Sequence, residues 1–233
     1  MNNIHKVLNK GMYLSLLLIM ACTPYYIVSD FESRTVEHKK VAILPFEMLF
    51  TGKIPADLTE EDVFAIEEAE SRAFQMSFYN EILRSTKSGR KPIKIELQPY
   101  NKTLNLLSEN DISIRESWIR DPQELAELLG VDAVIIARIE KMRFMSDLAS
   151  YGIELGVHIA NIIADDLLWP FIPPGVTTSK EILANYVLTD AVDGTTLWSI
   201  SFQIDADWRS PANEIIESVN RRSAKKFPYR INK

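Results

Sequence analysis

Apolar runs, some continuous and some alternating with polar residues, predict the first strands of this chain. Residues 41–46 and 133–139 are almost continuously apolar, which is typical of buried strands. Residues 92–97 alternate apolar and charged side chains, which predicts a strand with one covered face. Residues 48–58, between the first strand and the next periodic segment, contain a glycine and a proline and are predicted as a loop.

A hairpin is predicted near the C-terminus. Residues 182–191 and 195–204 read as two strands around Gly194, a residue that can take the positive φ of a tight turn. In the second strand Trp198 and every second residue after it are apolar, whereas most residues between them are polar. We therefore expect one face of the hairpin to be covered and the other to stay open.

Apolar residues spaced three and four apart predict three helices. The first follows Thr59, a predicted N-cap, and runs to about Arg84. The second starts after Asp121, which a proline follows, and stops at Gly130. The third opens after Ser210. The predicted order is β-α-β-α-β, an insertion, a β-hairpin and a last helix.

The insertion covers residues 145–180. On one helix, small residues at every fourth position would form a flat stripe that another backbone could approach closely. The stripe consists of Gly152, Gly156, Ala160 and Ala164. A proline-rich loop with Trp169 and Phe171 follows. Two interpretations stay open: the segment packs on its own domain, as most amphipathic helices do, or it contacts a membrane or another subunit.

The N-terminus resembles the signal of a bacterial lipoprotein. Residues 16–22, LLLIMAC, resemble the lipobox, and Lys6 and Lys10 provide a positive flank. The apolar stretch of about eight residues is too short to span a bilayer, which needs about 20. The resemblance implies that residues 1–21 are removed as a signal peptide and that Cys22 carries covalent lipid, palmitate included.

The lipobox also predicts where the domain begins and where the protein resides. Residues 22–40 are predicted as a lipidated tether, and residues 41–233 as a single domain that contains the insertion. Thr23, and not aspartate, follows the lipidated residue. In lipoproteins generally this favours the outer membrane, so we expect a lipid-anchored protein facing the periplasm.

Composition and the absence of known motifs argue against several classes of function. The net charge is −6, and removal of the signal deletes two lysines and no acidic residue, so an acidic surface argues against nucleic acid as a partner. Cys22 is the only cysteine, so the lipidated chain has no disulfide. The sequence has neither zinc-type histidine spacing nor a nucleophile elbow or phosphate loop. We expect no enzymatic activity, no metal and no cofactor other than the lipid.

Charged residues cluster in two places. Acidic residues between 60 and 70 are predicted to form a solvated helix face near an N-terminus. Basic residues gather at the C-terminal end: Arg221, Arg222, Lys225, Lys226, Arg230 and Lys233. Favourable charge at a helix C-terminus explains part of the basic group, and contact with anionic lipid headgroups is the alternative. Asp190 and Asp193 are predicted to form the hairpin turn.

Two segments resemble one superfamily of bacterial lipoproteins. Residues 124–135, ELAELLGVDAVI, resemble its helix, glycine, Asp-Ala and strand element. Residues 186–199 resemble its hairpin, in which a strand ends in Asp, turns at Gly and continues to Trp-Ser; residues 41–46 match its opening strand. The superfamily includes the penicillin-binding-protein activator and curli-secretion lipoproteins. It implies an α/β (α+β) fold like the TolB N-terminal domain: a mixed sheet with flanking helices and a helical insertion before the C-terminal hairpin.

The lipobox and the resemblance together predict an outer-membrane-anchored lipoprotein. Its expected role is that of a non-enzymatic protein-binding or assembly factor of the cell envelope. The expected partners are the membrane, through the lipid anchor, and envelope proteins, with self-association included. The alternative is an oligomeric secretion-channel component in which residues 145–175 contact the membrane or a neighbouring subunit.

Overall fold

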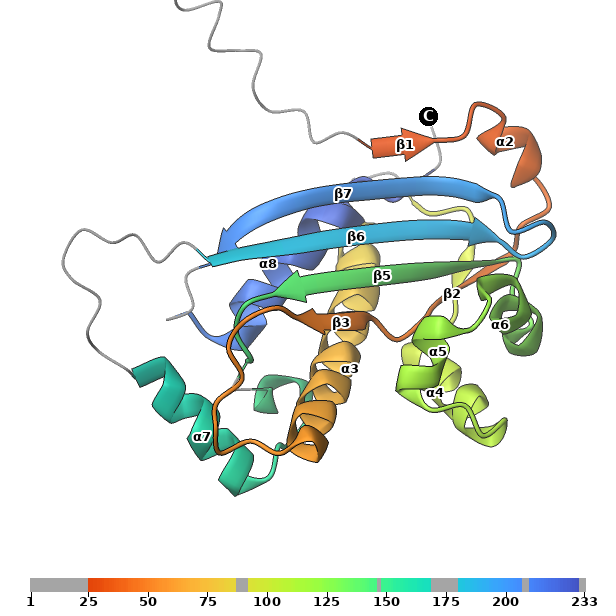
Figure 1. Cartoon of the computed structure of the whole chain (residues 1–233). Coiled ribbons are helices and arrows are strands. Elements are labelled where there is room, and N and C mark those ends of the chain that lie inside the picture. The colour runs from red at the N-terminus through yellow and green to blue at the C-terminus, as the bar shows by residue number, and fades with distance from the viewer. Residues whose placement is uncertain (1–24, 87–91, 146–147, 169–179, 207–209, 231–233) are drawn as a thin grey trace, which may run out of the picture.

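The computed structural model describes residues 25–86, 92–145, 148–168, 180–206 and 210–230 (Figure 1). The strands are β1 (Tyr25–Ile27), β2 (Lys40–Ile43), β3 (Glu47–Phe50), β4 (Glu96–Leu97), β5 (Ala133–Lys141), β6 (Lys180–Asp190) and β7 (Thr196–Ala206). The helices are α2 (Phe31–Arg34), α3 (Glu60–Arg84), α4 (Tyr100–Glu109), α5 (Ile114–Ile119), α6 (Pro122–Leu129), α7 (Val157–Leu168) and α8 (Ala212–Ala224).

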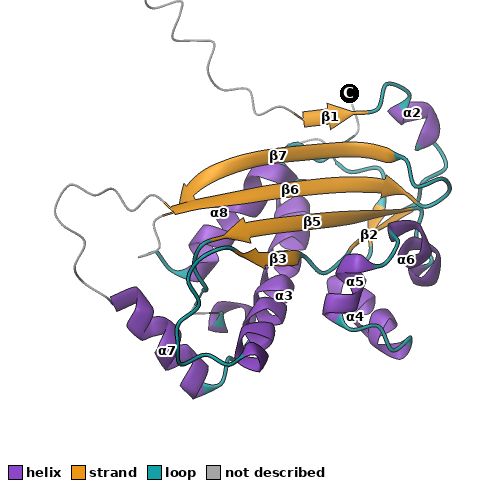
Figure 2. Cartoon of the chain, in the orientation of Figure 1, coloured by secondary structure: helices purple, strands orange, loops and turns teal. Residues whose placement is uncertain are grey.

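The described strands form one seven-stranded mixed sheet with helices on both faces (Figure 2). The strand order is β1-β7-β6-β5-β2-β4, and β3 pairs with β5 further along the same edge as β2. β2 and β3 run parallel to β5, whereas β5, β6, β7 and β1 pair antiparallel in turn. This confirms the predicted fold class, and α7 lies before the hairpin as predicted for the insertion.

The main core lies between one face of the sheet and helices α3 and α8. Its aromatic residues are Phe46, Phe74, Phe78, Tyr186, Trp198 and Phe227. A buried polar bridge joins β6, α8 and α3, because the Tyr186 hydroxyl donates to Asn220 Oδ1 at 2.6 Å and Asn220 Nδ2 donates to the Phe74 carbonyl at 2.9 Å. A buried polar group must be hydrogen-bonded to be tolerated, so this bridge also fixes how α3 and α8 meet.

The opposite face of the sheet is covered only in part. A second core packs α4 and α6 against β2 and the start of β5, and its members are Ala42, Leu44, Leu107, Ile112, Leu125, Ala126, Leu129, Val131 and Val134. In Figure 1 the helices α4 to α6 stand at one end of this face, and β7, β6 and the rest of β5 face the viewer. The prediction that one hairpin face stays open is therefore confirmed for the described residues.

The local signals at helix and turn boundaries are confirmed. Thr59 and Asp62 form a reciprocal capping box at the start of α3. The Asp121 side chain accepts hydrogen bonds from the first turn of α6, and Gly130 ends that helix with φ 62°. Gly194 has φ 69° in the hairpin turn, as predicted.

The predicted tether is corrected, because residues 25–40 belong to the folded domain. β1 pairs antiparallel with β7, with Tyr26 opposite Ser199, and α2 buries Phe31 in the main core. β-Branched and aromatic residues favour strands, and the outer edge of β7 offers a pairing partner. Of the predicted tether, only residues 22–24 lie outside the described residues.

Other element predictions need smaller corrections. The first residues of the predicted 48–58 loop belong to β3, which the parallel edge of β5 stabilises. The predicted strand 92–97 pairs with β2 only at Glu96–Leu97, because Ile93 and Lys94 instead bond to the C-terminal residues Arg230 and Tyr229. Helices α4 and α5 were not predicted.

Candidate functional site

The N-terminal edge of the sheet is the part of the domain nearest to the predicted lipid. Cys22 lies outside the described residues, three positions before Tyr25, the first residue of β1. Three residues span at most about 10 Å. β1 exposes 46% of Tyr25, 50% of Tyr26 and 39% of Ile27. Prediction from sequence missed this strand, although the run of two tyrosines and an isoleucine is itself a signal for one.

A polar network holds the N-terminal segment against the hairpin and the C-terminus. His38 Nδ1 lies 2.7 Å from the Tyr229 hydroxyl, and His38 Nε2 lies 3.9 Å from the buried Asp190 carboxylate. Burial, aided by the nearby charge of Asp190, raises the pKa of the Tyr229 phenol. Asp132 accepts hydrogen bonds from the backbone N–H groups of Lys39 and Lys40. These contacts make the first residues of the domain an integral part of the sheet edge.

The hairpin turn confirms the predicted role of its two aspartates. Asp190 Oδ1 accepts from the Val192 N–H at 2.9 Å, and Asp193 Oδ1 accepts from the Thr195 N–H at 3.0 Å. Asp193 also pairs with Arg34 of α2 at 2.8 Å. The hydrogen bonds from Thr195, together with Arg34, lower the pKa of Asp193 to about 2. The turn therefore also contacts the N-terminal segment.

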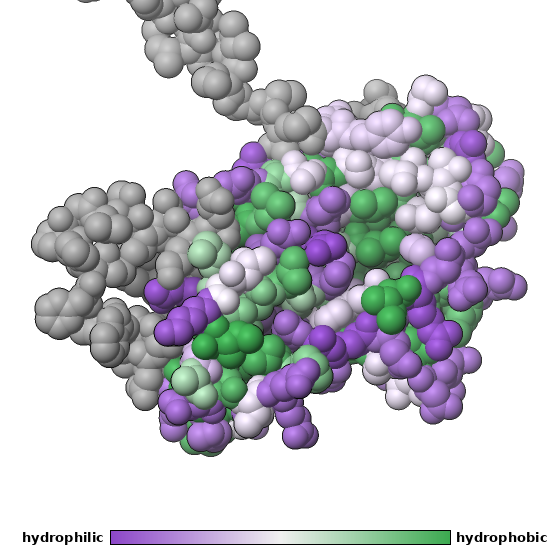
Figure 3. Space-filling view, in the orientation of Figure 1, coloured by the Kyte–Doolittle hydropathy of each residue, from purple (hydrophilic) through white to green (hydrophobic). Residues whose placement is uncertain are grey.

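We call the uncovered part of the sheet the open face. Its cross-strand rows are Tyr26–Ser199–Val187–Ile136, Ser201–Asn185–Arg138–Glu47 and Gln203–Leu183–Glu140–Leu49. Arg138 lies near its middle, 3.5 Å from Glu140 and 3.8 Å from Glu47. Figure 3 views this side and shows polar and apolar residues interleaved, not one continuous apolar patch.

The four small residues of the predicted stripe do not lie on one helix. Gly152 ends a short 3₁₀ turn with φ 69°, and α7 begins only at Val157, one residue after Gly156. Of the four positions only Ala160 and Ala164 lie on α7, because the positive φ interrupts the helix that the spacing presupposes. A Cβ added at Gly152 or Gly156 would have no other heavy atom within 4 Å, so neither glycine makes a close backbone contact within the described part of the chain. Contact of these residues with another subunit or a membrane stays a prediction.

Helix α7 packs on its own domain. Ile163 is buried, and Ile159 and Ile162 are partly buried, in a satellite core with Leu58 and Val63. In Figure 1 α7 lies beside the N-terminal end of α3, at the end of the molecule opposite β1. Trp169 and Phe171 lie outside the described residues, so their predicted role as contact residues stays a prediction.

A buried ion pair lies behind the open face. Lys141, the last residue of β5, places Nζ 2.7 Å from Oε2 of Glu70 on α3, and both side chains are almost wholly buried. Burial raises the pKa of Glu70 and lowers the pKa of Lys141, and each charge opposes the shift of the other. The pair bonds to neighbouring backbone groups at Met145 and Arg143, so we regard it as structural.

Neither a membrane-spanning helix nor a metal site is found among the described residues. Among them, no helix has the length and apolar character needed to cross a membrane. No group of three or more histidine, cysteine, aspartate or glutamate side chains in that part of the chain is arranged to hold a metal ion.

No family model and no curated protein matches the sequence. Among solved structures, the chain is similar to a PelC dodecamer from Paraburkholderia phytofirmans, with 13% identity, 84% of this chain and 90% of that chain covered, and a TM-score of 0.41. It is also similar to lipoprotein GNA1162 from Neisseria meningitidis, with 11% identity, 81% and 96% covered, and a TM-score of 0.43.

The LpoB C-terminal domain from Salmonella enterica is a third similar structure. It is 10% identical, the match covers 72% of this chain and 84% of that chain, and the TM-score is 0.35. At such identities and TM-scores the three resemblances assign no function to this chain.

Proposed function

We propose that the chain is a lipoprotein anchored through Cys22 in the bacterial outer membrane and facing the periplasm. Its domain acts there as a non-enzymatic protein-binding or assembly factor of the cell envelope. The open face is the surface that contacts the partner protein.

One observation carries the proposal: the lipobox-like run ends three positions before β1, the first strand of the open face. Lipid on Cys22 would hold the domain directly at the bilayer, because three residues reach at most about 10 Å. A domain held in this way meets other proteins of the same membrane within a narrow layer, which raises their effective concentration.

The chemistry of the open face suits a reversible protein contact. Arg138 sits between two carboxylates, with Asn185 beside it and Ser201 one strand further along the same row. Leu183 on the next row is 39% exposed. Interfaces of non-obligate complexes are about as apolar as the rest of the surface, and arginine is enriched in them. Charged side chains also give such contacts their orientation and selectivity.

A photo-crosslinking residue in place of Ser201 on the open face tests the proposal in intact cells. The same residue in place of Lys102, exposed on α4, is the matched control. We expect a discrete adduct with another envelope protein from position 201 and none from position 102. Adding Arg138→Glu should weaken the adduct, and adding Cys22→Ala should abolish palmitate incorporation, release the domain from the membrane and remove the adduct. Equal adducts from both positions, or labelled palmitate on the Cys22→Ala protein, would refute the proposal.

The alternative, an oligomeric secretion-channel component, makes a different prediction in the same experiment. Its adducts would join two copies of this chain. Membrane contact through α7 has little support, because Ile159, Ile162 and Ile163 of this helix pack internally at the end of the molecule opposite β1 (Figure 1).

A further inference from the structure

We infer that the edge formed by β1 and the C-terminal end of α8 lies flat against the anionic leaflet that holds the protein's own lipid, so that the domain stands upright with the open face turned sideways. This orientation rests on the proposed lipidation of Cys22. It adds to that proposal a defined membrane-contact surface, which we call the β1 edge and define as Tyr25, Tyr26, Ile27, Lys225 and Lys226.

Contacts between its two parts make the β1 edge one continuous surface. Lys226 Nζ lies 5.1 Å from the ring centroid of Tyr25, so the end of α8 adjoins the first strand. β1 is the outermost of the described strands, and the lipidated residue precedes it by three positions. The lipid and the basic C-terminal end, which are remote in sequence, therefore meet at the same edge of the sheet.

The side chains of the β1 edge suit the region of lipid headgroups. Tyr25 and Tyr26 are each about half exposed, and tyrosine is enriched at membrane interfaces because its ring is apolar and its hydroxyl polar. Lys225 and Lys226 are exposed. A basic residue close to an anionic membrane surface contributes about 1 kcal/mol of attraction.

Other charges near this edge are largely balanced within the protein. Arg221 on α8 pairs with Glu81 and Glu217. Arg34 pairs with both Asp30 and Asp193 at the far end of the N-terminal segment. Lys225 and Lys226 are therefore the charges of this edge that we expect to act on a bilayer. The carboxylate that Arg34 leaves in excess, and the exposed Glu32, belong to α2 and the hairpin turn and not to the β1 edge.

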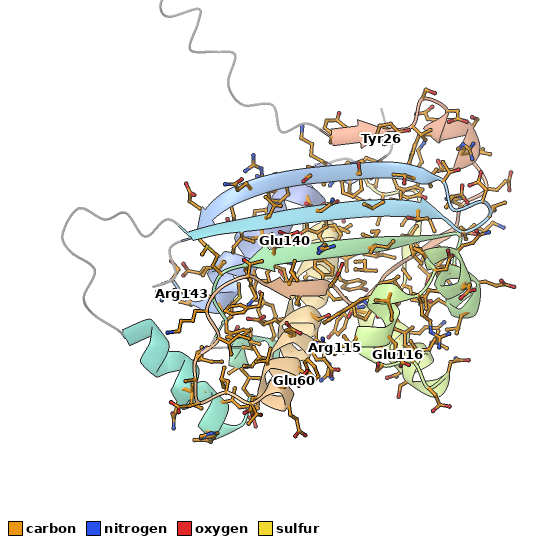
Figure 4. All side chains as sticks on the ribbon, in the orientation of Figure 1. Tyr26, Glu60, Arg115, Glu116, Glu140 and Arg143 are labelled. Atoms are coloured by element: carbon orange, nitrogen blue, oxygen red, sulfur yellow. The ribbon has the colours of Figure 1, made fainter. Side chains whose placement is uncertain are left out.

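The opposite end of the molecule has the opposite charge. Glu60, Glu61 and Asp62 begin α3, and Figure 4 shows Glu60 and Tyr26 at opposite ends of the view. A helix of 25 residues is about 38 Å long, so these acids can lie well beyond the range of headgroup contact. An anionic surface would repel them, which favours the same orientation as the lysines.

The orientation has a consequence for partner binding. Strands in a sheet lie about 4.8 Å apart, so β7, β6 and β5 lie at increasing distance from a bilayer that touches β1. The open face then stands roughly perpendicular to the membrane. A partner that projects from the same membrane could contact it without displacing the domain from the lipid.

Depth-dependent fluorescence quenching tests the orientation. Full-length lipidated protein is placed in vesicles of phosphatidylethanolamine and phosphatidylglycerol that contain a headgroup-linked nitroxide quencher. A fluorophore is attached through Ser29→Cys, next to β1, or through Glu60→Cys, at the far end. We expect strong quenching at position 29 and little at position 60. Lys225→Glu with Lys226→Glu should lower the contact equilibrium by about 30-fold or more, the effect of losing two such attractions.

The control reverses two lysines away from the β1 edge, Lys53→Glu with Lys102→Glu, and should leave quenching unchanged. Equal quenching at positions 29 and 60, or no difference between the two double variants, would overturn the inference while the lipoprotein proposal stands. Failure of the wild-type protein to float with vesicles would instead refute lipidation itself, and the orientation with it. A photo-crosslinking residue in place of Tyr26 can be used in the same vesicles. Adducts between two copies of the chain would show that a second chain, and not lipid, covers this edge, and would overturn the inference.

Discussion

Replacing Lys141 with methionine would leave the carboxylate of Glu70 buried without its counter-charge. In the folded chain the relative exposure of the two side chains is 1% and 0%, and Lys141 Nζ lies 2.7 Å from Glu70 Oε2. The surroundings satisfy both groups further: the Met145 N–H donates to Glu70 Oε1 at 2.7 Å, and Lys141 Nζ donates to the Arg143 carbonyl at 2.8 Å. The substitution removes the charge and retains much of the side-chain volume.

The expected loss is large because no water can solvate the abandoned carboxylate. Removing one partner of a buried ion pair typically costs about 3–5 kcal/mol. Whole domains have only about 5–15 kcal/mol of stability. For a chain of this length 1 kcal/mol corresponds to about 2–4 °C in Tm, so Lys141→Met should lower Tm by about 6–20 °C.

A double variant separates the charge from the packing. In Glu70→Gln with Lys141→Met neither side chain of the pair carries a charge, and the glutamine carbonyl can still accept the hydrogen bond from the Met145 N–H. Replacing both members of a buried ion pair with uncharged side chains often changes the free energy of unfolding very little. The double variant should therefore be more stable than Lys141→Met alone, which is the signature of coupled residues.

The pH dependence of the single variant follows from the same burial. Burial raises the pKa of Glu70, and the charge of Lys141 opposes that rise, so the pKa should rise further in Lys141→Met. A carboxyl whose folded pKa lies above the unfolded value of about 4.3 favours folding below that value, and this contribution is lost as the pH rises through the folded pKa. The deficit relative to wild type should be largest at neutral pH and narrow toward about pH 4.

Urea unfolding followed by far-ultraviolet circular dichroism measures these differences. A cost below about 1 kcal/mol for Lys141→Met at neutral pH would be that of an ordinary substitution and would contradict a buried pair. A double variant no more stable than the single one, or a deficit that grows on acidification, would show that packing and not charge determines the loss.

Three further outcomes can be checked on the same protein. Gly52→Ala should cost about 1–3 kcal/mol in urea unfolding, because its new Cβ would overlap the carbonyl oxygen of Met142 and lie 2.9 Å from the carbonyl carbon; an unchanged midpoint would contradict that approach. Gly194→Val should cost about 1–3 kcal/mol, because the residue has φ 69°; thermal unfolding at the wild-type temperature would refute the turn. Thr195→Val should raise the pKa of Asp193 from about 2 in a carbon-detected NMR titration, because it removes the largest cause of the depression. A carboxyl whose folded pKa is depressed stabilises the fold above its unfolded pKa of about 3.9. The stability that Asp193 contributes should therefore be lost between about pH 4 and about pH 2 in wild type, and at a higher pH in the variant. Coincident titration curves of the two proteins would contradict this.

The sequence alone determined the features that depend on neighbours along the chain. The caps at Thr59 and Asp121, the stop at Gly130 and the turn at Gly194 are satisfied by bonds or dihedral angles within a few residues. The lipobox that ends at Cys22 is local in the same sense, and its lipidation stays a prediction. The physical cause of each such feature lies within a few residues of it, so it can be predicted without knowledge of the fold.

Features that depend on distant residues were decided only by the tertiary structure. β1 is three residues long, and its residue types favour a strand, but it forms only because β7 offers an edge to pair with. That partner is distant in sequence and is not recorded in the local pattern. Glu70 and Lys141 are 71 positions apart, and only the packing of α3 under β5 brings them together. The spacing of Gly152 and Gly156 suggested a helix, but the backbone there does not continue as one.

The candidate surfaces were likewise only partly predictable from the sequence. Alternation along β7 predicted that one face would stay open, but the open face itself is assembled from β1, β3, β5, β6 and β7 by strand pairing. The β1 edge likewise joins Tyr25 to Lys226, the two ends of the domain. Periodicity indicates which side of a helix or strand is apolar. Which element packs against that side depends on residues distant in sequence, and is decided only when the whole chain folds.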